Sequence, residues 1–160
     1  MIRITFVALT VVLFLIFSIP ALGVFKLKEK KDAEGVQKRS LRLVQWVFRL
    51  ILRLAGVTYE VQGLEHIPSD RAVLYVGNHR SYFDILVGYV TVPGLTGFVA
   101  KKEMLKIPLL RDWMRRVNCL FLDRVDIKGA LRPFWKGLKR SEAAFQSGYF
   151  LRVPAMKARM

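Results

Sequence analysis

The first stretch of the chain is uniformly apolar. Ile4–Phe25 contains no charged residue. At 1.5 Å of rise per residue, a helix of this length is about 33 Å long, which is enough to cross the hydrocarbon core of a bilayer. The pattern therefore predicts a transmembrane or membrane-inserted helix over residues 1–25.

Two alternatives to a spanning helix follow from the same stretch. A secretory signal peptide would use Arg3 as its basic start and residues 21–23 (ALG) as its cleavage site. The length of the apolar run and the KLKEKK that follows it favour an uncleaved segment that is retained as a membrane anchor. A kink at Pro20 and Gly23 would instead give a shallow insertion that does not cross the bilayer. Because positive residues stay on the cytoplasmic side, we expect the rest of the chain on the cytoplasmic face.

A basic segment, residues 26–56, comes next and contains a predicted helix over 35–55 that ends at Gly56. Arginines recur along it at intervals that place them on one stripe with Trp46, namely Arg39, Arg42, Arg49 and Arg53. A basic, tryptophan-bearing amphipathic helix is typical of a membrane interface. The other interpretation is a helix packed on the domain with a solvated arginine face.

From residue 57 onward, short apolar runs alternate with helical patterns. The predicted strands are 57–62, 72–76, 96–100 and 119–122, and the predicted helices are 82–90, 106–117 and 129–146. Strands that alternate with helices predict an α/β domain with a mixed, largely parallel sheet over residues 57–148.

Composition adds a preference for anionic partners. The chain has 160 residues, enough for one domain with a core, and a formal net charge of +15. Nucleic acid, an acidic membrane surface and phosphorylated substrates all fit this charge. The apolar N-terminus and the lack of a recognisable nucleic-acid motif argue against nucleic acid. A single cysteine, Cys119, excludes an internal disulfide.

The stretch NHRSYFD, residues 78–84, follows the predicted strand 72–76. Ligands in open α/β sheets bind outside the carboxyl ends of strands, so His79 is well placed for function. Residues five apart on one helix are about 140° apart, so His79 meets Asp84 only from a loop. Ser81 and Asp84 form the S-x-x-D pattern of a capping box. Asp84 is therefore either a cap alone or the carboxylate that orients a general-base histidine.

Several segments together resemble the 1-acylglycerol-3-phosphate acyltransferase family, which makes phosphatidic acid. NHRSYFD resembles its N-H-x4-D motif, and FVAKKEMLKIPLL (98–110) resembles its F-x-A-K-x-E-L-x-x-x-P segment. NCLFLDR (118–124) resembles its second block, G-x-x-F-I-D-R, and LEHIP (64–68) resembles the segment before its first core strand. The resemblance runs from about residue 57 to 146.

The resemblance implies acyl transfer from acyl-CoA or acyl carrier protein to the free hydroxyl of lysophosphatidic acid, at a membrane lipid surface. His79 would be the general base and Asp84 its orienting partner. Arg124 and Lys101 would bind the acceptor phosphate. The substrate hydroxyl is the nucleophile, so Cys119 has no catalytic role, and no metal or cofactor is implied. The H-x4-D motif alone does not select the acceptor, so other lysolipid or glycerol-phosphate acceptors stay open.

The chain departs from the family after Gln146. The third block, F-P-E-G-T-R-S, is absent, and residues 149–160 are interpreted as an aberrant, out-of-frame tail. We expect the acyltransferase domain to be incomplete, its last strand to have an unpaired edge, and turnover to be low. The alternative function is that of a non-catalytic membrane-surface fragment.

Overall fold

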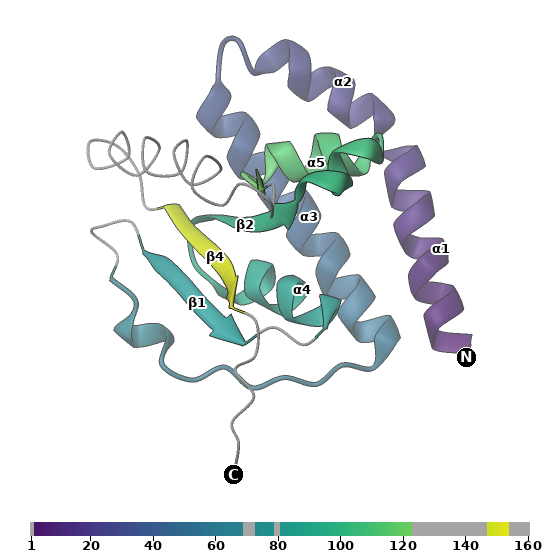
Figure 1. Cartoon of the computed structure of the whole chain (residues 1–160). Coiled ribbons are helices and arrows are strands. Elements are labelled where there is room, and N and C mark those ends of the chain that lie inside the picture. The colour runs from purple at the N-terminus through teal and green to yellow at the C-terminus, as the bar shows by residue number, and fades with distance from the viewer. Residues whose placement is uncertain (1, 69–72, 79–80, 123–146, 154–160) are drawn as a thin grey trace.

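The computed structural model describes residues 2–68, 73–78, 81–122 and 147–153 (Figure 1). Its helices are α1 (Ile2–Phe17), α2 (Ile19–Lys28), α3 (Ala33–Ala55), α4 (Tyr82–Thr91) and α5 (Leu110–Arg116). Its strands are β1 (Leu74–Asn78), β2 (Leu95–Lys101), β3 (Leu120–Leu122) and β4 (Ser147–Val153), and two 3-10 turns are η1 (Leu64–His66) and η2 (Lys102–Lys106). The predicted helix 129–146 lies outside the described residues.

The strands form one sheet in the order β1-β4-β2-β3, and every described pairing is parallel. This agrees with the predicted largely parallel α/β sheet. β4, the last described strand, lies between β1 and β2 (Figure 1). β4 crosses the predicted boundary between the acyltransferase domain (57–148) and the tail (149–160). It is paired along both edges, with β1 and with β2. The sequence predicted no strand here and assigned residues 149–160 to an aberrant tail. The last strand that it did predict, 119–122, corresponds to β3, which lies at the edge of the described sheet with β2 as its neighbour.

Two predicted elements differ in the structure. Residues 57–62 are not a strand: no described strand pairs with them, and alternation alone supplies no ladder partner. The predicted helix 106–117 begins later, as α5 at Leu110, because Leu109 has a positive φ of 60° that interrupts the helical backbone. By contrast, Gly56 ends α3 as predicted, in the left-handed conformation with φ 71°.

The apolar N-terminal stretch is divided into α1 and α2, which are bent by 46° relative to each other. Pro20 lies in the first turn of α2, where its missing N–H and its ring disturb a continuous helix. Among the described helices, none alone has the length and hydropathy of a membrane span. The bent pair meets those two criteria together.

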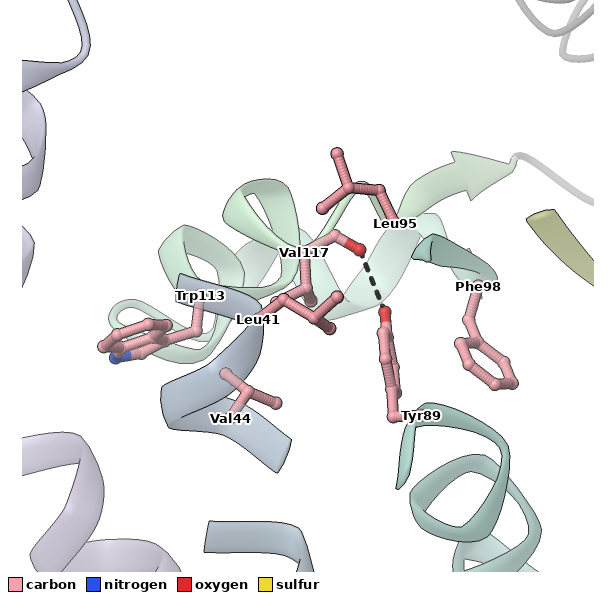
Figure 2. Close-up of a cluster of buried hydrophobic side chains, with 7 residues drawn as sticks. All are labelled: Leu41, Val44, Tyr89, Leu95, Phe98, Trp113 and Val117. Atoms are coloured by element: carbon pink, nitrogen blue, oxygen red, sulfur yellow. Dashed lines mark hydrogen bonds between the residues drawn. The ribbon is translucent and has the colours of Figure 1, made fainter. Parts of the chain in front are cut away.

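The core joins the N-terminal helices to the sheet. Its buried cluster consists of Leu41, Val44, Tyr89, Leu95, Phe98, Trp113 and Val117 (Figure 2). The Tyr89 hydroxyl donates to the carbonyl of Val117 at 3.1 Å, which ties α4 to the end of α5. Phe14 of α1 and Phe25 of α2 pack on Trp113, with ring centroids 5.1 and 6.2 Å away.

Gly97 of β2 allows a close backbone approach, and Gly97→Ala should destabilise the fold. A Cβ at this position would lie 2.8 Å from the carbonyl carbon of Asn118, and its oxygen is nearer still. Because the clash is with backbone, we expect a loss of about 1–3 kcal/mol in the free energy of unfolding, measured by urea denaturation in mild detergent. Gly23→Ala in α2 is the control: it meets no atom within 4 Å and should be neutral or stabilising. Equal stabilities for the two variants would contradict this prediction.

Candidate active site

The sheet register places the carboxyl ends of the four strands in one row. Asn78 of β1 lies beside Val153 of β4, and Lys101 of β2 lies beside Leu122 of β3. β2 and β4 pair with Leu95 opposite Ser147 and Phe98 opposite Phe150. Continued to the strand ends, this register brings Lys101 level with Val153. With about 4.8 Å between neighbouring strands, the row is about 14 Å long. Ligands of parallel sheets bind at this edge, so the candidate site lies here.

At the β1 end of the row, Asp84 is held by a complete capping box. Ser81 is the N-cap of α4, and its hydroxyl accepts a hydrogen bond from the Phe83 N–H at 3.2 Å. The Asp84 carboxylate in turn accepts from the Ser81 N–H at 2.8 Å. Asp84 is exposed and belongs to the first turn of α4. The predicted capping box is thus confirmed, and it fixes the carboxylate at the site edge. An additional role of Asp84 in orienting His79 stays a prediction.

The predicted partner of Asp84, His79, lies outside the described residues. It follows Asn78, the last residue of β1, and it precedes the N-cap Ser81 by two positions. A contact between His79 and Asp84 therefore stays a prediction. Arg124 also lies outside the described residues, two positions after β3 ends at Leu122.

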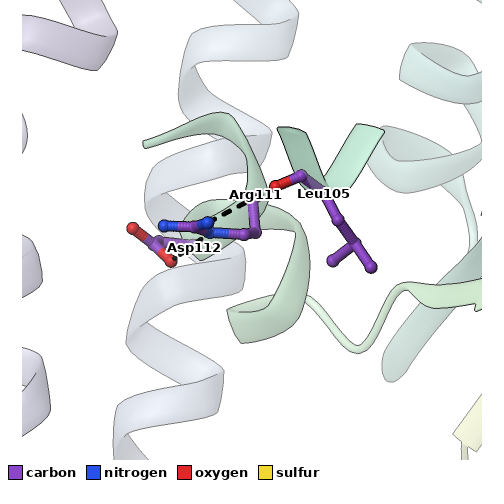
Figure 3. Close-up of polar contacts among 3 residues, drawn as sticks. All are labelled: Leu105, Arg111 and Asp112. Carbon is purple, nitrogen blue, oxygen red and sulfur yellow. Dashed lines mark hydrogen bonds and ion pairs between the residues drawn. The ribbon is translucent and has the colours of Figure 1, made fainter. Parts of the chain in front are cut away.

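Lys101 lies where the sequence predicted, at the carboxyl end of β2, and its side chain is exposed. The turn that follows it, η2, is tied to α5. Arg111 donates to the Leu105 carbonyl at 3.4 Å and pairs with Asp112 at 3.2 Å (Figure 3). The hydrogen bond to Leu105 joins η2 to α5, whereas the Arg111–Asp112 pair lies within α5.

Cys119 has the environment of a structural thiol. Its sulfur lies 3.1 Å from the Tyr89 hydroxyl. Burial raises the pKa of the Cys119 thiol, although the Tyr89 hydrogen bond acts in the opposite direction. Burial likewise raises the pKa of Tyr89 well above its usual value, with a contribution from Cys119. Because the reactive thiolate is disfavoured, a nucleophilic role for Cys119 is not supported.

Tyr82 belongs to the same helical turn as Asp84 and is not among the site residues predicted from the sequence. Its side chain is 82% exposed, unusually open for an aromatic residue. The available signal was its place inside NHRSYFD, two positions before the aspartate.

Within the described parts of the chain, no group of three or more His, Cys, Asp or Glu side chains is arranged to hold a metal ion.

Known proteins resemble this chain in sequence and in fold. The chain is 27% identical over 111 residues to the 1-acyl-sn-glycerol-3-phosphate acyltransferase of Borreliella burgdorferi, a match that covers 69% of this chain and 44% of that protein. It is 29% identical over 92 residues to the human 1-acyl-sn-glycerol-3-phosphate acyltransferase alpha, covering 56% and 32%. The chain thus spans less than half the length of these curated relatives.

A solved structure shares the fold. The crystal structure of the 1-acyl-sn-glycerophosphate acyltransferase PlsC from Thermotoga maritima matches with a TM-score of 0.60 and 24% identity, covering 95% of this chain and 64% of that one. The sequence model of the family named Acyltransferase matches residues 58–148, more than half of the chain. This match includes β1, the Asp84 cap and Lys101, so the chain belongs to the Acyltransferase family.

Proposed function

We propose that this site transfers an acyl group from an acyl thioester, on coenzyme A or acyl carrier protein, to the free hydroxyl of 1-acylglycerol-3-phosphate. Membership of the Acyltransferase family and the similarity to 1-acyl-sn-glycerol-3-phosphate acyltransferases support the reaction class. The main structural support for the site is the row of strand ends, because it brings Lys101 to the same edge of the sheet as the Asp84 cap.

In the proposed mechanism, His79 removes the proton from the acceptor hydroxyl as the oxygen attacks the thioester carbonyl carbon. The carbon–sulfur bond then breaks, and the same proton passes from the imidazolium to the leaving thiolate. Asp84 holds the tautomer of His79 and stabilises its charged form, as the aspartate does in a serine hydrolase triad. The capping box serves this role, since the Ser81 N–H fixes one carboxylate oxygen at 2.8 Å.

The acceptor phosphate is assigned to the basic residues further along the row. Lys101 ends β2, two strand spacings from β1, or about 10 Å away. Arg124 follows the next strand and offers a planar fork of donors. A glycerol phosphate bound along the row would place its hydroxyl near His79 and its phosphate toward Lys101 and Arg124.

The position of β4 indicates where the family's third block belongs. β4 ends between β1 and β2, so we assign a block that directly follows β4 to the middle of the row. An F-P-E-G-T-R-S segment there would add its arginine between His79 and Lys101. We define the extended chain as this sequence with residues 154–160 replaced by F-P-E-G-T-R-S.

The function is tested by expressing the chain as printed and the extended chain in membranes. Lysophosphatidic acid and acyl-CoA or acyl carrier protein are supplied, and phosphatidic acid is measured over an empty-vector background. We expect the extended chain to make more phosphatidic acid than the printed one. Lysophosphatidylcholine and glycerol 3-phosphate, offered as competing acceptors, test the acceptor. Product at background level from both forms would contradict the proposed reaction, and a preference for another acceptor would contradict the substrate.

A further inference from the structure

One exposed face of α3 concentrates positive charge. We call it the basic face of α3, and it consists of Arg39, Arg42, Trp46, Arg49 and Arg53. All five side chains are exposed, and Trp46 is 62% exposed. The opposite face of the helix supplies the buried residues Val36, Ser40, Leu41, Val44, Val47, Ile51 and Leu52. Packing of α3 on the domain therefore leaves the arginines and the tryptophan pointing outward together.

Most of this charge has no partner in the described part of the chain. Arg39 pairs with Asp32 at 3.6 Å. No carboxylate of the described residues forms a salt bridge with Arg42, Arg49 or Arg53. From Arg42 to Arg53 the face extends about 16 Å along the helix axis. An extended run of uncompensated guanidinium groups fits a surface that carries many anions better than it fits one small ligand.

The basic face belongs to the same packed unit as the bent apolar helices. α1 packs against α3 (Figure 1). The Arg3 guanidinium at the start of α1 lies against Gly56 at the end of α3, so the two helices run in opposite directions. α1 and α2 also expose large apolar side chains, among them Phe17 (76%) and Leu27 (78%). A partner that covers both kinds of surface must offer apolar material and anionic groups together.

We propose that the basic face of α3 binds the anionic headgroups of a phospholipid membrane. Guanidinium groups bind phosphate through paired donors, and tryptophan favours the level of the headgroups, where one side is apolar and the other is wet. The exposed apolar side chains of α1 and α2, two helices that contact α3, supply the surface that enters the lipid. The proposal is that this face makes the chain prefer anionic lipid over neutral lipid. It does not depend on acyl transfer, so it can fail or hold independently of the proposed reaction.

The test measures partition of the whole chain into vesicles by flotation, after dilution from mild detergent. Vesicles of phosphatidylcholine alone are compared with vesicles that also contain phosphatidylglycerol. We expect the double variant Arg42→Gln/Arg49→Gln to bind the anionic vesicles about 25-fold less than the unaltered chain, roughly fivefold for each arginine. Its binding to neutral vesicles should be unchanged, and high salt should reduce the difference.

Matched variants separate charge from folding. Arg42→Lys/Arg49→Lys keeps both charges and should keep the preference for anionic vesicles, while circular dichroism checks that all variants are equally folded. Trp46 should lie close to the lipid. Brominated lipid in the vesicles should therefore quench part of the tryptophan fluorescence of the chain, and this quenched part should be missing in Trp46→Phe. The proposal is overturned if the glutamine variant keeps the full preference. It is also overturned if a short DNA duplex or an acidic protein binds the face more tightly than the anionic vesicles do.

Discussion

Replacing His79 by alanine in the extended chain should lower phosphatidic acid formation by about 10²–10⁴-fold, the usual contribution of a general base. Binding of lysophosphatidic acid should persist, because Lys101 and Arg124 are assigned to the phosphate. Initial rates at saturating acceptor measure the first effect, and equilibrium binding of the acceptor measures the second. A His79→Ala variant with turnover near that of its parent would show that the base is elsewhere.

Asp84 has two roles that substitutions can separate. Asp84→Asn keeps an oxygen that can accept from the Ser81 N–H, so the capping box should survive while the charge beside His79 is lost. We expect severely reduced turnover with little change in stability. Ser81→Ala is the matched control: it removes the hydroxyl that accepts from Phe83, and should cost about 0.5–2 kcal/mol of stability. If Asp84→Asn instead unfolds readily and its folded fraction turns over normally, Asp84 is a cap only.

Trp113→Ala should produce the largest loss of stability among single substitutions in the described core. The indole is 3% exposed and packs against Phe14 and Phe25. Its N–H donates to the Ser18 hydroxyl at 2.8 Å, at the bend between α1 and α2. Truncation of a buried tryptophan costs about 3–5 kcal/mol, which we expect as a shift in the urea midpoint measured in mild detergent.

Trp113→Phe isolates the hydrogen bond from the packing. It keeps most of the aromatic volume and removes the indole N–H, so its cost should be nearer 1 kcal/mol. Arg116 also joins α5 to the N-terminal helices, because it pairs with Glu29 at 3.5 Å and its guanidinium carbon lies 5.8 Å from the centre of the Phe25 ring. A Trp113→Ala variant as stable as the phenylalanine variant would mean that the N-terminal helices do not depend on this contact.

Local signals in the sequence predicted local structure well. Gly56 is read as a helix end because glycine adopts positive φ at little cost, and α3 ends there. Ser81 and Asp84 are read as a capping box because their spacing matches one helical turn, and both hydrogen bonds are present. The carboxyl end of β2 at Lys101 follows from the apolar run before it. Each of these features is decided by residues that are close together in the chain.

Features decided by distant residues were not predictable in the same way. Residues 57–62 alternate as a strand does, but a strand also needs a neighbour, and sequence spacing does not supply one. The start of α5 depends on the backbone of Leu109, where no glycine marks the positive φ. The central place of β4 is a matter of strand order, which chain order does not determine.

The central position of β4 has a consequence for how the sheet assembles during synthesis. β1 and β2 leave the ribosome long before Ser147–Val153, yet the structure pairs each of them with β4 and not with each other. Parallel pairings across such sequence separations form slowly, because a long loop must close first. Until β4 arrives, the facing edges of β1 and β2 are open to other chains. The nascent sheet should therefore become resistant to proteolysis only after residues 147–153 have emerged from the ribosome.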